Sequence, residues 1–131
     1  MVVILRKTKR LHVHVHISEV PKTLCSSLAE NMFDQFVLRD FDDGKAPIRP
    51  TERVSIIIQN YQPGGKHFLH KHDDVEQVYF ILKGKARVKL GDEVIEAGEG
   101  EFIYIPRGLL HSNENIGEGE LKVMLIGVKV V

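Results

Sequence analysis

The feature that most constrains the fold is a series of short β-like segments in residues 51–131, separated by glycine, proline and aspartate. Short strands at close spacing with turn residues between them are typical of an all-β sandwich or barrel. A parallel sheet would need helices between its strands, and no such alternation occurs in this region. The predicted strands are Val54–Tyr61, His67–His72, Gln77–Leu82, Ala86–Leu90, Glu93–Glu96, Glu101–Ile105 and Leu121–Val130. The sequence therefore predicts an all-β, antiparallel barrel.

Residues 1–50 differ in character and are predicted to form an N-terminal extension that packs on the barrel of residues 51–131. Leu11–Ile17 alternates apolar residues with histidines, which predicts a strand with one apolar face. Pro21–Phe36 begins with proline and has apolar residues spaced four apart, which predicts a helix of about three turns. The extension is expected to contribute one strand and one short helix.

The polar face of the predicted strand Leu11–Ile17 consists of His12, His14 and His16. Three histidines at a spacing of two can bind a surface cation, but an amphipathic strand also simply exposes its polar face to water. Such a strand can in addition cover an open sheet edge of a second subunit. All three interpretations stay open at the level of the sequence.

The charge balance and the single cysteine limit the classes of partner and compartment. Lys plus Arg equals Asp plus Glu, 18 against 18, so the excess of basic residues that a nucleic-acid binder needs is lacking. Cys25 is the only cysteine and cannot form an internal disulfide. The first residues do not have the order of charges and apolar residues of a secretory signal, and no segment is long and apolar enough to span a bilayer. We expect a cytoplasmic protein without nucleic-acid or membrane partners.

Two stretches of chain combine histidines with turn residues. His70 and His72 are two residues apart, so on a strand they project to one face and form half of a site for a first-row metal. His111 follows the turn Pro106-Arg107-Gly108 at the end of another predicted strand, a position suited to entering the same space. The alternative is a solvated His-x-His pair and an unrelated turn histidine.

The two stretches together resemble the two-part signature of the cupin superfamily. The first block has Gly64 before the histidine pair and Gly84 after it; the second begins at Gly100, with fifteen residues between the blocks, and ends at Asn115. The resemblance covers about residues 54–130 and points to a small single-domain, conserved-barrel cupin. It implies a jelly-roll fold, one divalent transition metal (Mn, Fe, Co, Ni, Cu or Zn) on the three histidines, and a homodimer.

The fourth metal ligand of the family is usually a glutamate, with six residues between it and the second glycine of the first block. Counting back from Gly84, that position is Gln77, whereas a shorter spacing after His72 selects Glu76. Neighbouring residues of a strand face opposite sides, so both cannot point at the metal without a bulge. We favour Gln77, with Glu76 as the alternative ligand.

A glutamine ligand bears on the chemistry. Three imidazoles and an amide oxygen are neutral, so the site keeps the full charge of the cation and is a better Lewis acid for stabilising an enediolate. Gln77 in this position resembles the cupins with isomerase or lyase chemistry on a small polar metabolite, such as a sugar acid or keto acid. A metal-dependent dioxygenase is the alternative enzyme, and a non-catalytic small-molecule sensor is the alternative from another class.

A proton-transfer enzyme also needs a general acid or base near the metal. Tyr79 shares the face of Gln77 and can line the interior, although an aromatic residue there can equally be packing. Glu76, if it is not a ligand, is the second candidate catalytic residue. Arg107 can meet a substrate carboxylate or be solvated, and His67 is expected to face away from the site because it stands three residues before His70.

Overall fold

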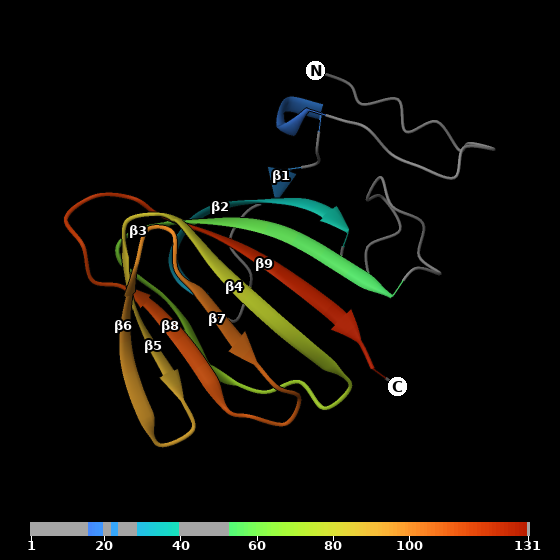
Figure 1. The fold of residues 1–131 in the computed structure, drawn as a ribbon. Coiled ribbons are helices and arrows are strands. Elements are labelled where there is room, and N and C mark those ends of the chain that lie inside the picture. Colours follow the sequence, from blue (N-terminus) through green and yellow to red (C-terminus); the bar gives the residue numbers. More distant parts are fainter. Residues whose placement is uncertain (1–15, 20–21, 24–28, 40–52, 131) are drawn as a thin grey trace.

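Strand β3 (Val54–His70) organises the fold because it pairs with strands in both halves of the sheet (Figure 1). The computed structural model describes residues 16–19, 22–23, 29–39 and 53–130. Its further elements are the 3-10 helix η1 (Ile17–Glu19) and the strands β1 (Lys22–Thr23), β2 (Ala29–Arg39), β4 (Val75–Lys83), β5 (Lys85–Leu90), β6 (Glu93–Gly98), β7 (Phe102–Ile105), β8 (His111–Asn115) and β9 (Leu121–Lys129).

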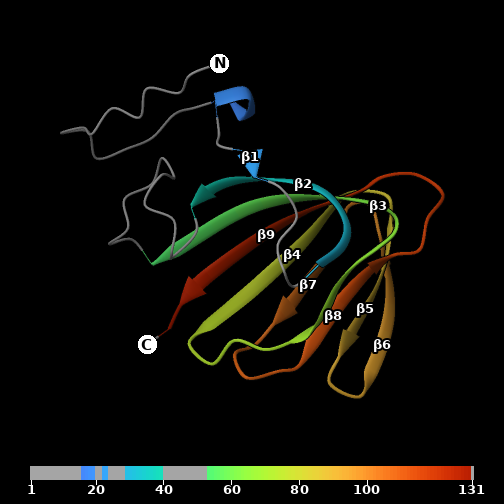
Figure 2. The ribbon, with the colours of Figure 1, turned by 180° about the vertical axis from the view of Figure 1, so that it is seen from behind.

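The strands form one curled antiparallel sheet in the order β6-β5-β8-β3-β9-β4-β7, and β2 adds to β3 outside this path. Strands β5, β6 and β8 make one layer, and β4, β7 and β9 make the other, as the two opposite views show (Figures 1 and 2). This confirms the predicted all-β, antiparallel jelly-roll fold. Within the described residues, no helix is both long and apolar enough to cross a membrane.

The segment Pro63-Gly64-Gly65 is a bend inside β3 and not the predicted turn between two strands. The first half of β3 pairs with β9 along Val54–Tyr61, and the second half pairs with β8 from Lys66 to His70. Gly64 has a φ of 80°, a left-handed conformation that side chains other than glycine rarely adopt. The bend thus lets one strand pass from one layer to the other.

Two further differences from the sequence prediction concern individual elements. Strand β8 was not predicted, because His111–Asn115 is short and wholly polar and has no alternation of apolar residues. The helix predicted at Pro21–Phe36 is wrong: its described part belongs to β1 and β2, and β2 pairs with β3 from Ala29 to Arg39. A spacing of four places residues on one face of a strand as well as of a helix, and pairing with β3 decides between the two.

Most of the strand predicted at Leu11–Ile17 lies outside the described residues. Its last residues are described: His16 is exposed, and Ile17 begins η1. The His16 imidazole Nδ1 lies 2.9 Å from the hydroxyl of Ser18, a local contact within the turn. His12 and His14 lie outside the described residues.

The apolar core lies between the two layers and comes from alternate residues of the strands. Tyr61, Ile81, Val88, Leu121 and Val123 are wholly buried there. The corner between β4 and β5 is tight, because a Cβ on Gly84 would come within 2.6 Å of the Glu120 carbonyl oxygen and Gly84 has a φ of 91°. The core extends to the histidines, because its members Tyr61 and Tyr79 lie beside His67 and His111.

Candidate metal centre

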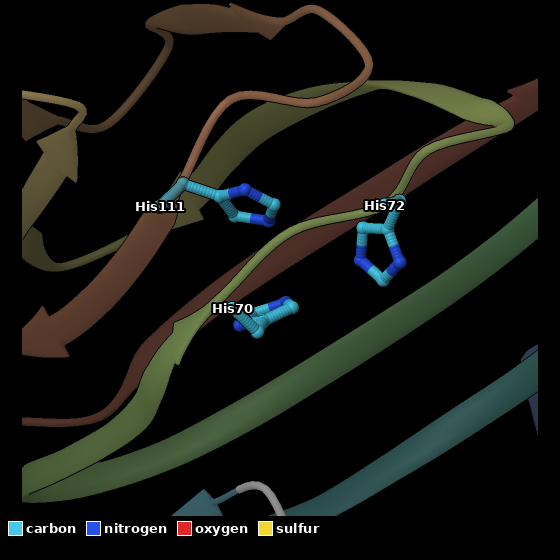
Figure 3. A group of neighbouring side chains, drawn as sticks. All are labelled: His70, His72 and His111. Atoms are coloured by element: carbon cyan, nitrogen blue, oxygen red, sulfur yellow. The ribbon is translucent and has the colours of Figure 1, made fainter.

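Three histidines from two separate stretches of chain lie close together (Figure 3). His70 ends β3, His72 lies in the connection to β4, and His111 begins β8. His70 and His111 are direct cross-strand partners, so the β3–β8 ladder itself brings them together. One potential ligand atom from each of the three lies within 4.8 Å of the others, which is a spacing that one metal ion can bridge.

The backbone fixes which imidazole nitrogens are left for a metal. The Nδ1 of His70 lies 2.6 Å from the Phe68 carbonyl oxygen, and the Nδ1 of His111 lies 2.8 Å from the Leu109 carbonyl oxygen. A carbonyl oxygen can only accept, so each Nδ1 carries the proton and donates it, and each Nε2 keeps its lone pair. Metal-binding histidines are commonly oriented in this way by a second hydrogen bond.

His111 is the most deeply buried of the three histidines, and burial affects the protonation of its imidazole. It is 1% exposed, and its Nε2 has no hydrogen-bond partner in the described structure. Burial lowers the pKa of His111 to about 4, helped by the neighbouring His70 and His72, while the hydrogen bond to the Leu109 carbonyl acts in the opposite direction. The neutral form with an available lone pair is the form that binds a metal, so the donor set fits a divalent transition ion.

The two candidates for the fourth ligand face opposite sides of β4. The oxygen of the Gln77 amide is buried and has no hydrogen-bond partner, and Gln77 shares its face with the buried Tyr79. The carboxylate of Glu76 accepts a hydrogen bond from the hydroxyl of Tyr104, 2.7 Å away, on the exposed face of the sheet. The structure therefore places Gln77 on the interior side and does not bring Glu76 to the histidines; the assignment of the fourth ligand itself stays a prediction.

The two candidate acid–base residues, Tyr79 and Glu76, also lie on opposite faces of β4. Tyr79 is 1% exposed, and its ring lies edge-on to that of His111 with 6.2 Å between centroids. Its hydroxyl has no partner, and burial raises its pKa, so Tyr79 is a neutral phenol beside the histidines. Glu76 stands on the outer face, so only Tyr79 of the two candidates lies near the cluster. Their catalytic roles stay predictions.

His67 is a member of the site that sequence reasoning missed. The pairing of β3 with β8 is irregular between His67 and His70, and this bulge turns His67 inward, where it is 8% exposed. Its ring centroid lies 5.0 Å from that of His70. Burial lowers the pKa of His67 to about 4, with His70, His111 and His72 adding to the effect. The glycines just upstream were the one signal in the sequence for such an irregularity.

A buried hydrogen-bonded chain orients His67. The hydroxyl of Tyr61 donates to the Gln59 amide oxygen at 2.5 Å, and the same hydroxyl oxygen lies 3.3 Å from the His67 Nδ1. Because the Tyr61 proton goes to Gln59, the Nδ1 of His67 is the donor of the second contact. The remaining lone pair of His67 is on Nε2, as in His70 and His111.

The last sequence predictions concern the strand before Pro106 and the turn that follows it. Phe102 and Tyr104 face outward, 70% and 56% exposed, whereas Ile103 and Ile105 are buried. Arg107 is exposed, but its turn is tied to the site, because the next residue donates a backbone hydrogen bond to the carbonyl oxygen of His72 at 2.6 Å. Arg107 thus stands at the rim of the site and not in the barrel interior.

Comparison with known proteins agrees with the class that this fold and histidine cluster define, a jelly-roll barrel with a candidate metal centre. The family model of the cupin domain matches residues 57–127, more than half of the chain. The chain therefore belongs to the cupin family.

Individual relatives are only partly covered. An uncharacterized protein of Methanocaldococcus jannaschii is 43% identical over 61 residues, which are 47% of this chain and 49% of the relative. The oxalate decarboxylase of Bacillus subtilis is 35% identical over 74 residues, 53% of this chain and 19% of the relative. The chain thus spans less than half of the length of both proteins.

A solved structure shows the likeness of fold over nearly the whole chain. A predicted oxalate decarboxylase of Thermotoga maritima has a TM-score of 0.75 with 19% sequence identity, and the match covers 89% of this chain and 99% of that one. At this identity the likeness speaks for the fold alone.

Proposed function

We propose that this protein binds one divalent transition metal on His70, His72, His111 and Gln77, and that it is a metal-dependent enzyme acting on a small oxygen-bearing metabolite. The observation that carries the proposal is the fixed tautomer of the histidines. Two backbone carbonyls hold the protons of His70 and His111 on Nδ1, which leaves the Nε2 lone pairs for a ligand at the centre of the cluster.

The neutrality of the ligand set favours isomerase or lyase chemistry. Neither a carboxylate nor a thiolate belongs to the histidine cluster in the described residues, and the buried oxygens of Gln77 and Tyr79 are uncharged and have no hydrogen-bond partner. A divalent ion held by neutral ligands supplies Lewis-acid stabilisation of negative charge on a substrate oxygen. The chain's own contribution is to orient the substrate, exclude water and offer the neutral hydroxyl of Tyr79 as a proton donor.

The relatives support a substrate with carboxylate oxygens. The decarboxylase of Bacillus subtilis is named for oxalate, a small acid whose oxygens are ligands that divalent metals accept. Decarboxylation breaks a carbon–carbon bond without adding water, and so falls on the lyase side of the proposal. The match covers only 19% of that relative, so a carboxylic acid substrate for this chain is our proposal and is not inferred from the relative alone.

Elemental analysis of the protein purified from its native cells tests the metal. We expect close to one equivalent of a first-row transition metal, and its loss in the variant His111→Ala. His16→Ala is the matched control, because it removes an exposed imidazole far from the cluster in the chain. A protein that binds none of these metals, or a His111→Ala variant that keeps its metal, contradicts the proposal.

Turnover with and without oxygen tests the reaction. We expect the metal-loaded protein to convert a small carboxylic acid at the same rate in air and under nitrogen, because isomerases and lyases need no oxidant. Oxygen consumption coupled to turnover would identify the dioxygenase alternative. Metal binding without turnover across a library of small acids would identify the sensor alternative.

A further inference from the structure

Several buried polar atoms beside the histidine cluster have no hydrogen-bond partner. They are the hydroxyl of Tyr79 and both amide atoms of Asn113, in addition to the ligand atoms of His111 and Gln77. Tyr79 and Asn113 are each only 1% exposed. Native proteins pair nearly all buried polar groups, because an unpaired one costs about 1–3 kcal/mol. Two such side chains next to one candidate metal centre therefore indicate a ligand that the chain does not itself supply.

These two side chains are neighbours of the histidines from opposite layers. Asn113 follows His111 by two residues on β8, so the two side chains share the inner face of that strand, and it is the cross-strand partner of His67. Tyr79 comes from β4 in the other layer, and its ring contacts that of His111. The metal centre thus has a buried polar neighbourhood of an amide and a phenol.

This neighbourhood carries no charge. None of the lysines, arginines, aspartates or glutamates in residues 53–130 is buried, and the buried polar residues are hydroxyl, amide and imidazole groups. An amide and a phenol can each donate and accept, which suits a hydroxyl or carbonyl group. Apart from the metal, whose charge the first carboxylate of the substrate would already meet, a second carboxylate buried there would have no cationic side chain to pair with, and such burial is unfavourable.

We propose that Asn113 and Tyr79 form a second subsite that binds an uncharged hydroxyl or carbonyl group of the substrate, beyond the part that meets the metal. The substrate class is accordingly a monocarboxylic hydroxy or keto acid with a further neutral oxygen, and not a dicarboxylate. This inference rests on the proposed metal-dependent function and narrows its substrate.

Three 2-hydroxy acids with the same metal-binding end test the subsite. Lactate ends in a methyl group, glycerate in a hydroxymethyl group and malate in a carboxymethyl group, so they differ only in the part offered to Asn113 and Tyr79. Binding is measured by isothermal titration of the cobalt-loaded protein and by the change in its visible absorption. We expect glycerate to bind about tenfold more tightly than lactate, corresponding to one or two buried hydrogen bonds, and malate to bind more weakly than glycerate.

Variants separate the subsite from the scaffold. We expect Tyr79→Phe and Asn113→Leu each to remove most of the preference for glycerate over lactate while lactate binding stays within about twofold. Tyr104→Phe is the matched control, since it deletes the same hydroxyl on the outer face, where Tyr104 contacts Glu76. The melting temperature of the ligand-free variants should stay unchanged or rise, because the deleted groups have no partners.

The outcomes distinguish failure of this inference from failure of the proposed function. If none of the three acids binds better to the cobalt-loaded protein than to the metal-free protein, the proposed function fails. If they do bind but malate is preferred, or if the preference for glycerate survives in both variants, the subsite is wrong. A sharp drop in the melting temperature of both variants would show a structural role for the two side chains and would equally overturn the inference.

Discussion

The two ends of strand β8 bury the same kind of side chain and satisfy it differently. At the far end, Asn115 is 1% exposed and its amide is fully used: it donates to the carbonyl oxygens of Tyr61 and Gly119 and accepts from the backbone of Gly117. At the near end, His111 and Asn113 are buried to the same degree, yet His111 Nε2 and both amide atoms of Asn113 lack partners. The buried amide of Asn115 thus stabilises the scaffold, whereas the buried polar atoms of His111 and Asn113 are available to a ligand.

The largest effect that this comparison predicts is at Asn115. Asn115→Ala removes one buried and two partly buried hydrogen bonds to the backbone of Tyr61 and of the Gly117–Gly119 turn, so we expect a loss of about 3 kcal/mol in the free energy of unfolding. Asn113→Ala makes the same chemical change two residues away and should cost about 1 kcal/mol, chiefly through the cavity it leaves. Urea denaturation measures the free energy of unfolding of both variants. Equal losses would show that the two asparagines contribute equally to stability and would contradict the proposed difference between the two ends of β8.

The next effect concerns the metal at the near end. His111→Ala should weaken the binding of Co²⁺ at least about 100-fold, because the variant loses one of three imidazoles that the fold holds together. The metal-free variant should lose stability as well, because it loses the hydrogen bond from Nδ1 to the Leu109 carbonyl oxygen and leaves a cavity. Competition with a chelator measures affinity, and His16→Ala should leave it unchanged.

The pH dependence of the metal-free protein should follow the buried histidines. The pKa of His67 is lowered from 6.5 to about 4 in the folded state, so between these values the unfolded chain binds a proton that the folded chain does not. Stability from this group is therefore present above pH 6.5 and lost as the pH falls, by roughly 1–2 kcal/mol between pH 7 and pH 5. Urea denaturation at the two pH values should show a smaller difference for His67→Gln, and an unchanged difference would contradict this assignment.

The smallest effect is expected at the fourth ligand. Gln77→Ala should weaken Co²⁺ binding by about tenfold, as loss of one neutral oxygen ligand beside three histidines implies. Glu76→Ala should leave the affinity nearly unchanged, because Glu76 contacts Tyr104 on the outer face. Titration calorimetry measures the two constants, and the reverse order would assign the ligand to Glu76.

Local signals in the sequence were sufficient for the barrel and for the histidine cluster. Turn residues between short apolar runs predicted an antiparallel β fold, and two blocks of glycines and histidines predicted that His70, His72 and His111 lie close together. Each of these signals depends on spacing within a short stretch, which the sequence displays directly.

Long-range pairing accounts for what the sequence did not predict. The residues of β2 have a spacing compatible with a helix, and they are a strand because β3 is there to pair with them. His67 points inward because of a bulge that only the β3–β8 ladder reveals, and β8 itself is a strand without any apolar residue. Which buried amides find partners likewise depends on neighbours from distant parts of the chain, so the contrast between Asn113 and Asn115 was not visible beforehand.

The cross-strand pairing of His70 with His111 has a consequence for folding. All of β4, β5, β6 and β7 lies in the chain between these two residues, so their contact closes a loop of 40 residues, 71–110. Closing such a loop costs conformational entropy that grows only slowly with its length. An ion chelated by both imidazoles would act as a reversible cross-link across that loop. Removal of the ion would remove this constraint on the four strands that the loop contains.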